Sequence, residues 1–518
     1  MSSLSNWLGT ANPQFLRECR GRLKPRSVMA AVGLSVLFQL LLLLSVYEPG
    51  VVPRLDLTQV AQTLSWMMPY ALFALGGYYI VDDLTQEAKT GTLNFIRLSP
   101  RPAREILLGK LIGVPMLPML LVLTLVPLHV FSGLVTGLSP LLLLSYYLIV
   151  GAGTVTVFIL ALLVGLGSGA SKLAQQRAVS AISFSGLTLF ALSPIFMFWN
   201  TLFTWQTVTT GPELFLGVSE SVEWLYLDIA TNPWFAHLFV LLNLAGVSAI
   251  AWQMAVRKFR VPHSTLLSKR LSYVGVAYAN FVGWGFAWSS QLANYDQASM
   301  MVALYFLNVA LFFVLIFAIA PSRQMLLDWV RYRNSAQSLS GNALSVSGGK
   351  SAWRAWLWAD ASPSVAAVGV NFLIAAGLIF PSFYWFVSTD AYPNGEVTFV
   401  ALLFAAVSIL VSALTYATLV QVIFSRRLRV PIVWAAGCVA VLVIVPPLVL
   451  LFQSMFPEDF GILWTFFGIP MMGVAATQVT VRSLIGLLGQ LCFLGFLLNR
   501  LNVNLKALAV QRSTSDWS

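Results

Sequence analysis

Few residues in this chain have the types and spacing needed for catalysis or metal binding. The three histidines, His129, His237 and His263, are not spaced as a metal-binding pair, and no serine stands in a G-x-S-x-G elbow. The three cysteines are scattered along the sequence, so they indicate neither a disulfide framework nor a metal cluster. We therefore predict no catalytic residue and no metal site in this chain.

One triplet, Gly349-Lys350-Ser351, has the ending of a nucleotide-binding phosphate loop. Such a loop needs a glycine five residues earlier so that backbone amides surround the phosphates, and Leu344 stands there. The surrounding segment 334–350 is rich in Ser, Gly and Asn and is predicted to be disordered. We therefore expect that the chain is not an enzyme, binds no cofactor and does not hydrolyse ATP by itself.

The composition predicts that the rest of the chain forms membrane-spanning helices. Of its 518 residues, 58% are hydrophobic and only 9% are charged, which is too few charged groups to cover a soluble fold. A bilayer core accepts about 20 apolar residues per helical span, and backbone groups in lipid must bond within their own segment. We therefore predict an all-α, polytopic transmembrane bundle. We attribute its net charge of +11 to basic loops at the cytoplasmic face and predict no nucleic-acid partner.

The apolar runs and the basic residues together predict about twelve spans with both termini in the cytoplasm. In this orientation 28 of the 30 Lys and Arg residues are cytoplasmic, as expected of loops that retain positive charge. The seventh span is the least hydrophobic, and it is kept because the later basic loops would otherwise face outward. The spans lie at roughly 28–47, 60–81, 107–132, 140–166, 178–200, 234–255, 272–290, 298–320, 364–388, 397–424, 431–453 and 482–499.

Matching loops suggest two halves of six spans each. The second cytoplasmic loop is long in both halves, and both loops end in a Ser-Pro step, Ser99-Pro100 and Ser362-Pro363. A parallel six-plus-six repeat would explain this, although Ser-Pro is also a common loop signal that can recur by chance. The predicted parts are a cytoplasmic amphipathic elbow (1–27), a six-helix domain (28–255) with the loop 82–106, a basic linker (256–271), a second half (272–499) with the loop 321–363, and a cytoplasmic tail (500–518).

Two further sets of residues are interpreted from their position relative to the spans. Residues 11–27 alternate apolar and basic types, which predicts a short helix on the inner membrane surface with its bases near anionic headgroups; a solvated basic tail is the alternative. No Asp or Glu lies inside a predicted span, which disfavours an ion-coupled carrier. Polar residues inside the spans are assigned to hydrogen bonds between helices. They are Gln39, Asn243, Asn308, Asn371, Gln421 and Gln490.

The most informative stretch is 82–110, DDLTQEAKTGTLNFIRLSPRPAREILLGK. Asp83 and Gln86 form a capping pair for a helix predicted over roughly 84–97, which ends before Pro100 because the residue preceding a proline is extended. Gly91 in its middle costs about 1 kcal/mol relative to Ala, so close packing or a break is expected there. We therefore predict a short rigid helix on the cytoplasmic face. Such a helix can transmit force from a bound partner to the membrane helices.

This stretch resembles the hallmark of the permease subunits of type 2 ABC exporters. That family pattern has an acid, a Gly-Thr-Leu, a Ser/Thr-Pro step and a Gly-Lys that opens the third helix. The opening segment and the long outer segment 201–233 are also similar to the family's elbow helix and re-entrant outer helices. The likeness covers residues 11–255 well and the second half by topology only. In this chain the pattern is carried by Glu87, Gly91, Thr92, Leu93, Ser99, Pro100, Ile106, Gly109 and Lys110.

The resemblance implies a transport subunit in the plasma (inner) membrane of a prokaryote. In that family the loop helix docks into a groove of a separate ATP-binding subunit, which hydrolyses ATP and moves the permease between inward and outward states. The residues carried over to the coupling helix are Glu87, Gly91, Thr92 and Leu93, and those carried over to its junction with the third span are Ser99, Pro100, Gly109 and Lys110.

The chain departs from the family in its length. A typical member has six spans and works as a dimer, whereas this chain has about twelve, and its second half lacks the Gly-Thr-Leu element. Either one chain forms the complete transmembrane domain, or the second half is a module added to a permease that pairs with a second copy. A membrane scaffold or assembly protein without a transport path is the alternative function.

Overall fold

The structure is a computed structural model of the whole chain. It describes residues 12–49, 54–168, 181–188, 223–228, 233–288, 294–339, 350–388, 399–453, 455, 457–467 and 480–510. Two compact units are present: the first comprises Met1–Val222 with Asp228–Pro262, and the second comprises Glu223–Leu227 with His263–Ser518. The main division therefore falls within the segment 256–271.

The described residues form a multi-pass helical membrane protein, as the composition predicted. Eight helices are long and apolar enough to cross a membrane, or nine if the bent pair Leu304–Ala318 and Arg323–Tyr332 forms one span. Helices account for most of the described residues of each predicted span, and the described part of the fifth, 181–188, is also helical. The predicted all-α class is thus confirmed.

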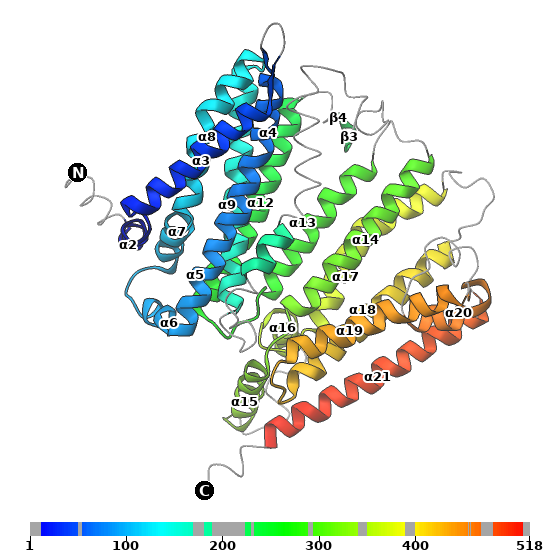
Figure 1. Cartoon of the computed structure of the whole chain (residues 1–518). Helices are drawn as coiled ribbons and strands as arrows, with labels where there is room; N and C mark the ends of the chain where they lie inside the picture. The colour runs from blue at the N-terminus through cyan, green and yellow to red at the C-terminus, as the bar shows by residue number, and fades with distance from the viewer. Residues whose placement is uncertain are drawn as a thin grey trace. The chain divides into compact units, whose positions relative to one another are not determined.

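In the first unit, α3 and α4 pack on α8, whereas α9 packs on α5 and α12 (Figure 1). Its core contains Leu64, Met68, Leu125 and Tyr146, all of them buried. The elements of this unit are α2 (Pro13–Arg22), α3 (Pro25–Ser45), β1 (Tyr47–Glu48), β2 (Arg54–Leu55), α4 (Leu57–Tyr70), the π-helix η1 (Ala71–Gly76), α5 (Gly77–Thr90), α6 (Thr92–Arg97), α7 (Ala103–Gly113), α8 (Met116–Val135), α9 (Pro140–Ser168) and α12 (Pro233–Arg260).

Two predicted spans of the first unit have different ends in the structure. The second span, predicted at 60–81, belongs to a continuous helical run over Leu57–Thr90, in which η1 follows Pro69. Proline lacks the N–H of the α-helical ladder, and π-turns re-form the ladder with wider spacing. The third span, predicted at 107–132, is divided into α7 and α8 at Val114-Pro115. The structure therefore corrects the predicted start of the third membrane helix.

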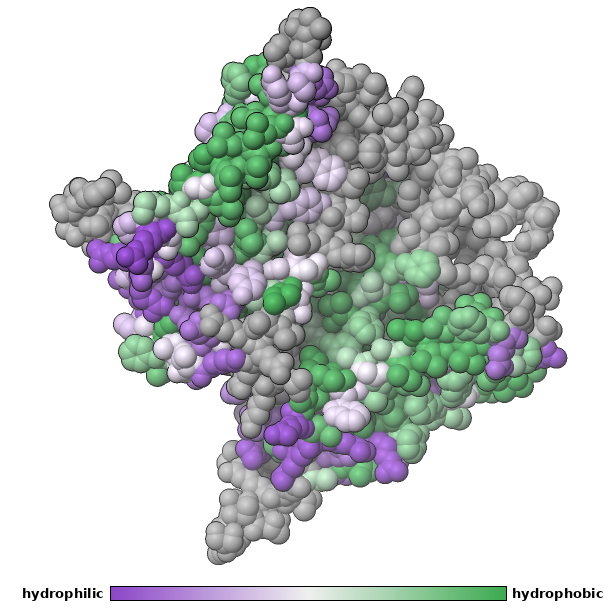
Figure 2. All heavy atoms as spheres, in the orientation of Figure 1, coloured by the Kyte–Doolittle hydropathy of each residue, from purple (hydrophilic) through white to green (hydrophobic). Residues whose placement is uncertain are grey.

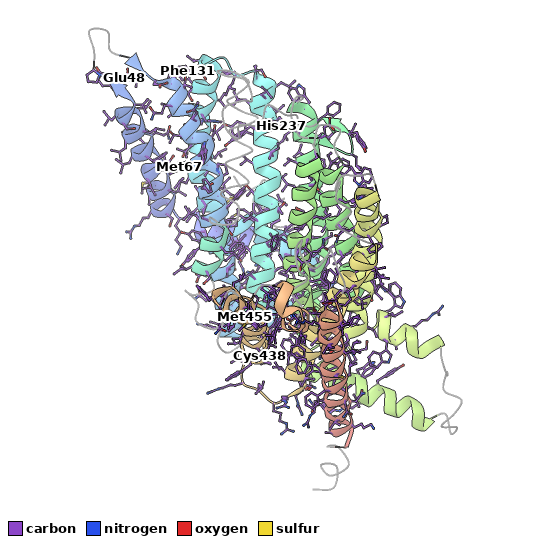
Figure 3. The ribbon with its side chains drawn as sticks, turned by 90° about the vertical axis from the view of Figure 1, so that its right-hand side faces the viewer. Glu48, Met67, Phe131, His237, Cys438 and Met455 are labelled. Carbon is purple, nitrogen blue, oxygen red and sulfur yellow. The ribbon has the colours of Figure 1, made fainter. Side chains whose placement is uncertain are left out.

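The far end of the first unit from α6 carries a hairpin. Strands β1 and β2 pair antiparallel, with Tyr47 opposite Leu55 and Glu48 opposite Arg54. Glu48 and Phe131, near the end of α8, lie at the same end of this unit (Figure 3). Of the segment 201–233, only 223–228 and Pro233 are described, so the expected re-entrant helices lie outside the described residues.

The second unit is built around α13, α17 and α18, with α21 and α19 packed on α18. Val276, Ile319, Val368 and Ala417 lie in its core. Its elements are α13 (Lys269–Ala287), α14 (Asn294–Ala318), α15 (Arg323–Leu339), α16 (Lys350–Trp358), α17 (Val365–Ser388), α18 (Phe399–Ser425), α19 (Pro431–Phe452), α20 (Pro457–Phe466) and α21 (Val481–Val510), and the short strands β3 (Glu223–Trp224) and β4 (Leu227–Asp228) form a second hairpin.

The predicted disordered segment 334–350 is partly helical. Residues 334–339 continue α15, which corrects the prediction there, and Lys350 begins α16; residues 340–349 lie outside the described part. The interpretation of the polar span residues holds for most of them. Amide groups of Gln39, Asn371, Gln421 and Gln490 donate across to Thr124, Ser272, Pro321 and Ser412 at 2.9–3.3 Å, whereas Asn243 and Asn308 bond within their own helices.

Apolar surface follows the outermost helices of both units. In the first unit, α3 exposes Met29, Leu37 and Leu44, and Figure 2 shows a hydrophobic face along this helix next to a hydrophilic surface over α2. Burying such a face in lipid rather than water is favourable by about 25 cal/mol per Å². The apolar surface along α3 therefore ends at the hydrophilic surface over α2.

Candidate functional site

Helix α2, which falls in the predicted elbow, begins at residues that suit a helix terminus. The side-chain oxygen of Asn12 accepts a hydrogen bond from the Phe15 N–H at 3.0 Å, and Pro13 occupies the first helical position. Leu23 and Lys24 separate α2 from α3, which starts at Pro25. The predicted short helix within 11–27 is thus confirmed, and an unstructured basic tail is excluded for Pro13–Arg22.

Two glycines on one face of α7 allow α2 to lie close against it. A Cβ atom at Gly109 would be 2.8 Å from the Phe15 backbone nitrogen and 2.8 Å from Asn12 Oδ1, and one at Gly113 would be 2.7 Å from Glu18 Cβ. Residues four apart share a helix face, and small side chains there let backbones approach. Asn12 also donates from Nδ2 to the Glu105 carbonyl at 2.8 Å. Gly109 therefore works as a packing residue.

We expect Gly109→Ala to destabilise the first unit by about 1–3 kcal/mol, the usual cost of overpacking. The measurement is the melting temperature in detergent, together with maleimide labelling of Cys19, which lies half-buried on α2. Exposed Cys438 and Cys492 are first replaced by Ser. Gly21→Ala is the control, since nothing lies within 4 Å of its added Cβ. Equal melting temperatures and labelling rates for the two variants would contradict this packing role.

Six charged side chains from α2, α5 and α7 meet beside this contact, and we call them the charge cluster. They comprise three bases and three acids, so their formal charges cancel. Asp83 and Glu87 are one turn apart on α5 and face the other two helices. The members of the charge cluster are Arg17, Glu18, Arg22, Asp83, Glu87 and Lys110.

Lys110 lies at the centre of the charge cluster, and its side chain is fully buried. Its Nζ is 2.7 Å from Asp83 Oδ2, 2.8 Å from Glu87 Oε2 and 3.6 Å from Glu18 Oε1. The three carboxylates are close enough to hold a cation, and the Lys110 ammonium takes that place. Burial by itself lowers the pKa of Lys110, but the three carboxylates act in the opposite direction and leave the pKa above its ordinary value.

Two arginines of the elbow complete the charge cluster. Arg17 Nη2 is 2.9 Å from Glu87 Oε1, and Arg22 Nη2 is 2.5 Å from Asp83 Oδ1. Burial lowers the pKa of Arg17, whereas Glu18 and Glu87 more than offset this and raise it. Acids of the same chain therefore bind two of the bases of α2, and the predicted contact of its bases with anionic headgroups stays a prediction. The cluster fixes α2 to the end of the second span.

The predicted single helix over 84–97 is wrong, because the chain breaks at Gly91. Helix α5 continues the second span to Thr90, Gly91 adopts the left-handed conformation at φ 78°, and α6 begins at Thr92. A left-handed glycine after the last residue is a common way to end a helix. Asp83 is not a cap but an interior residue of α5 that binds Arg22 and Lys110. The expectation of a break at Gly91 is confirmed.

Helix α6 has one buried and one exposed apolar side. Leu93 and Ile96 are buried, whereas Phe95 is 78% exposed and Leu98, just after the helix, is 84% exposed. The Arg97 guanidinium lies over the Phe259 ring of α12 at 5.5 Å, and burial lowers the pKa of Arg97. The helix is thus seated on the first unit and presents two large apolar side chains outward.

The structure brings only some of the predicted site residues together. Glu87 and Lys110 are in direct contact, and the Thr92 hydroxyl donates to the Glu87 carbonyl at 3.2 Å. Ser99 and Pro100 lie in the turn between α6 and α7. Leu93 is buried within the first unit. The exposed residues that could contact a partner, Phe95 and Leu98, were missed.

The second Ser-Pro step has a different environment. Ser362 is fully buried, and its hydroxyl accepts from Lys269 Nζ at 2.6 Å. Lys269 also donates to the carbonyls of Trp356 and Pro363 at 2.7 and 3.1 Å, and burial lowers its pKa to about 8. Backbone carbonyls and a hydroxyl thus surround this lysine, whereas carboxylates surround Lys110.

Comparison with known proteins gives no relative for this arrangement. No family model, no curated protein and no solved structure matches the chain.

Proposed function

We propose that this chain is the transmembrane permease subunit of an ATP-driven exporter and that a separate ATP-binding subunit docks on α6. The support is the resemblance of residues 82–110 to the exporter pattern together with the geometry around α6. The single observation that carries the proposal is the exposed apolar pair formed by Phe95 on α6 and Leu98 just after it, with the exposed polar residues Asn94 and Arg101 close by in sequence. Exposed apolar side chains with a polar surround are typical of protein interaction sites.

The proposal includes a membrane topology. The chain has about twelve spans with both termini in the cytoplasm, and its two units are the halves of a six-plus-six arrangement. The support is the cytoplasmic bias of Lys and Arg and the division of the fold at Pro262. In this orientation α6 and the charge cluster face the cytoplasm, where an ATP-binding subunit is available. The membrane is the plasma (inner) membrane of a prokaryote.

The connections of α6 suggest how force would reach the membrane helices. Its first residue follows Gly91 directly, and α5 continues through η1 into α4 as one helical run over Leu57–Thr90. The charge cluster ties the end of α5 to α7 and α2 through Lys110 and Arg22. A displacement of α6 would therefore be passed to the second span, the elbow and the start of the third membrane helix together.

The docking proposal is tested by placing charges on α6. The double variant Phe95→Asp, Leu98→Asp should fold normally, because both side chains are exposed, and should lose capture of the ATP-binding subunit in mild detergent. Truncating central apolar contacts typically costs 2 kcal/mol or more, so we expect affinity to fall at least about thirtyfold. ATP-dependent export by the reconstituted pair should fall in parallel.

Tyr332→Asp is the matched control, since Tyr332 on α15 is also 78% exposed. It should leave capture and export unchanged. If no ATP-binding subunit copurifies with the wild-type chain and no ATP-dependent export is reconstituted, the exporter proposal is lost and the alternative of a membrane scaffold is favoured. If the control and the α6 variant lose capture equally, α6 is not the docking element.

A further inference from the structure

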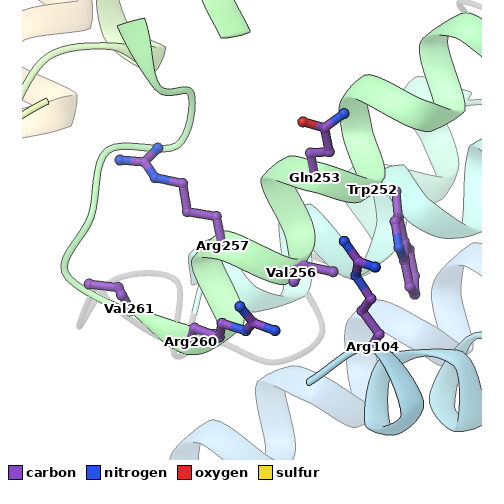
Figure 4. A pocket seen from close by; sticks show the side chains of 7 residues that line it. All are labelled: Arg104, Trp252, Gln253, Val256, Arg257, Arg260 and Val261. Atoms are coloured by element: carbon purple, nitrogen blue, oxygen red, sulfur yellow. The ribbon is translucent and has the colours of Figure 1, made fainter. Parts of the chain in front are cut away.

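A second feature of the first unit does not depend on export activity. An open cavity of about 310 Å³ lies between the first turn of α7 and the last turns of α12. Its lining includes Arg104, Arg257, Arg260, Trp252 and Gln253, and it contains no acid. Figure 4 shows Arg104 reaching from α7 to the side of Trp252, whereas Arg257 points away from both.

Two of the arginines that line this cavity, Arg104 and Arg260, differ from those of the charge cluster in their lack of a charged partner among the described residues. In the part of the chain that the structure describes, neither Arg104 nor Arg260 forms an ion pair or a hydrogen bond with another side chain. The nearest acid in sequence to Arg104 is Glu105, and it pairs instead with Arg101 at 3.3 Å. Both Arg104 and Arg260 are exposed, and an anion between two guanidinium groups that face one cavity would be attracted by both of them.

A helix terminus alone does not explain this arrangement. Bases in the last turn of α12 complement the partial negative charge of its C-terminal carbonyls, which accounts for Arg257 and Arg260. The helix dipole does not explain Arg104, because Arg104 lies in the first turn of α7, where the dipole favours acidic side chains. The fork of each guanidinium matches the oxygens of a phosphate.

The position of the cavity also selects its ligand. Helix α12 is apolar enough to span a membrane over Trp234–Arg260, and the cavity lies at the basic end of this span. Trp252, half-buried about two turns before that end, has the position of an interfacial aromatic ring. Basic pockets at helix ends on the cytoplasmic side bind the headgroups of anionic lipids.

We propose that this cavity binds a phosphate group carrying net negative charge, with Arg104 and Arg260 as its ligands and an anionic phospholipid as its source. Trp252 packs beside the glycerol end of that lipid. The same chemistry would accept a soluble phosphate, and the two sources are separated by experiment.

The test uses the full chain, delipidated in detergent and examined by native mass spectrometry. It is titrated with phosphatidylglycerol, with phosphatidylcholine of the same acyl chains, and with inorganic phosphate. Wild-type protein should bind phosphatidylglycerol at least about tenfold more tightly than phosphatidylcholine, a difference typical of charge-assisted hydrogen bonds. The double variant Arg104→Gln, Arg260→Gln should lose this preference, and Arg104→Lys, Arg260→Lys should retain part of it.

Arg20→Gln, Arg26→Gln is the matched control, because it removes the same charge from two exposed arginines outside the cavity. It should keep the preference. Displacement of phosphatidylglycerol by inorganic phosphate supports the phosphate assignment, and binding of inorganic phosphate without lipid preference, lost only in the cavity variant, identifies a soluble source. If the cavity variant and the control bind every probe alike, the proposal is overturned.

Discussion

Lys110→Met should destabilise the first unit by about 3–5 kcal/mol, the cost of breaking a buried ion pair from one side. The methionine fills a similar volume but removes the one fully buried cation among Glu18, Asp83 and Glu87, so that three carboxylates face only the two partly exposed arginines Arg17 and Arg22. A loss of this size approaches the total stability of many domains. The variant should therefore accumulate poorly, and its melting temperature in detergent should fall well below that of the wild type.

Two further variants separate this electrostatic effect from lost packing. Adding Asp83→Asn and Glu87→Gln to Lys110→Met removes the repulsion and should recover much of the stability. Lys89→Met removes the same charge from an exposed position of α5 and should change stability by no more than about 0.5 kcal/mol. If the triple variant is no more stable than Lys110→Met, the cluster contributes through packing and the electrostatic account is wrong.

The direction of the Lys110 pKa also predicts how this effect depends on pH. A lysine whose folded pKa is raised stabilises the fold at every pH below the unfolded value of 10.5, and the contribution is lost only as the pH rises through the folded value. The stability difference between wild type and Lys110→Met should therefore stay constant from about pH 7 to about pH 9. A difference that shrinks within this window would show that the ammonium titrates there.

The helical class and the elbow could be predicted because they rest on local pattern. Apolar runs of span length and the sequence Asn12-Pro13 before a basic amphipathic stretch specify their own structure. The helix over 84–97 was wrong for a reason that is not local. Asp83 and Gln86 match a capping pair, but Asp83 is engaged by Arg22, which is 61 residues away, and by Lys110, so α5 continues through it.

The charge cluster itself could be predicted only in part. Asp83 and Glu87 are four residues apart, so the sequence predicts that they share a helix face. Both Glu87 and Lys110 also belong to the exporter pattern that residues 82–110 resemble. Their mutual contact depends on how α5 packs against α7, which no spacing within either helix specifies. The exposure of Phe95 and Leu98 was equally hidden, because six residues are too few for helical periodicity to separate a buried from an exposed side.

Gly91→Val should abolish capture of the ATP-binding subunit and ATP-driven export while costing the fold only about 1–2 kcal/mol, the usual penalty of left-handed backbone for a residue with a Cβ. Gly91 has φ 78°, and its added Cβ would meet nothing within 4 Å, so the strain is confined to the backbone. Relieving that strain requires a change of φ, which redirects α6 away from α12 and displaces Phe95 and Leu98.

Gly137→Val provides a control with the same strain at a different place. Gly137 has φ 92°, its added Cβ also meets nothing within 4 Å, and it lies in the turn between α8 and α9. The two variants should lose similar stability, because both glycines adopt the left-handed conformation in open space. Only Gly91→Val should lose capture and export. Gly91→Asn should keep much of the capture and export of the wild type, since asparagine tolerates this conformation.

The comparison of these variants separates the effect of the orientation of α6 from the effect of lost stability. If both valine variants keep capture, α6 does not need its angle to α5, and a docked partner cannot be using that angle to move the second span. If both lose capture in proportion to their lost stability, the partner recognises only a folded first unit. Loss confined to Gly91→Val, at matched melting temperature, requires that the left-handed residue between α5 and α6 orients the surface on which the partner acts.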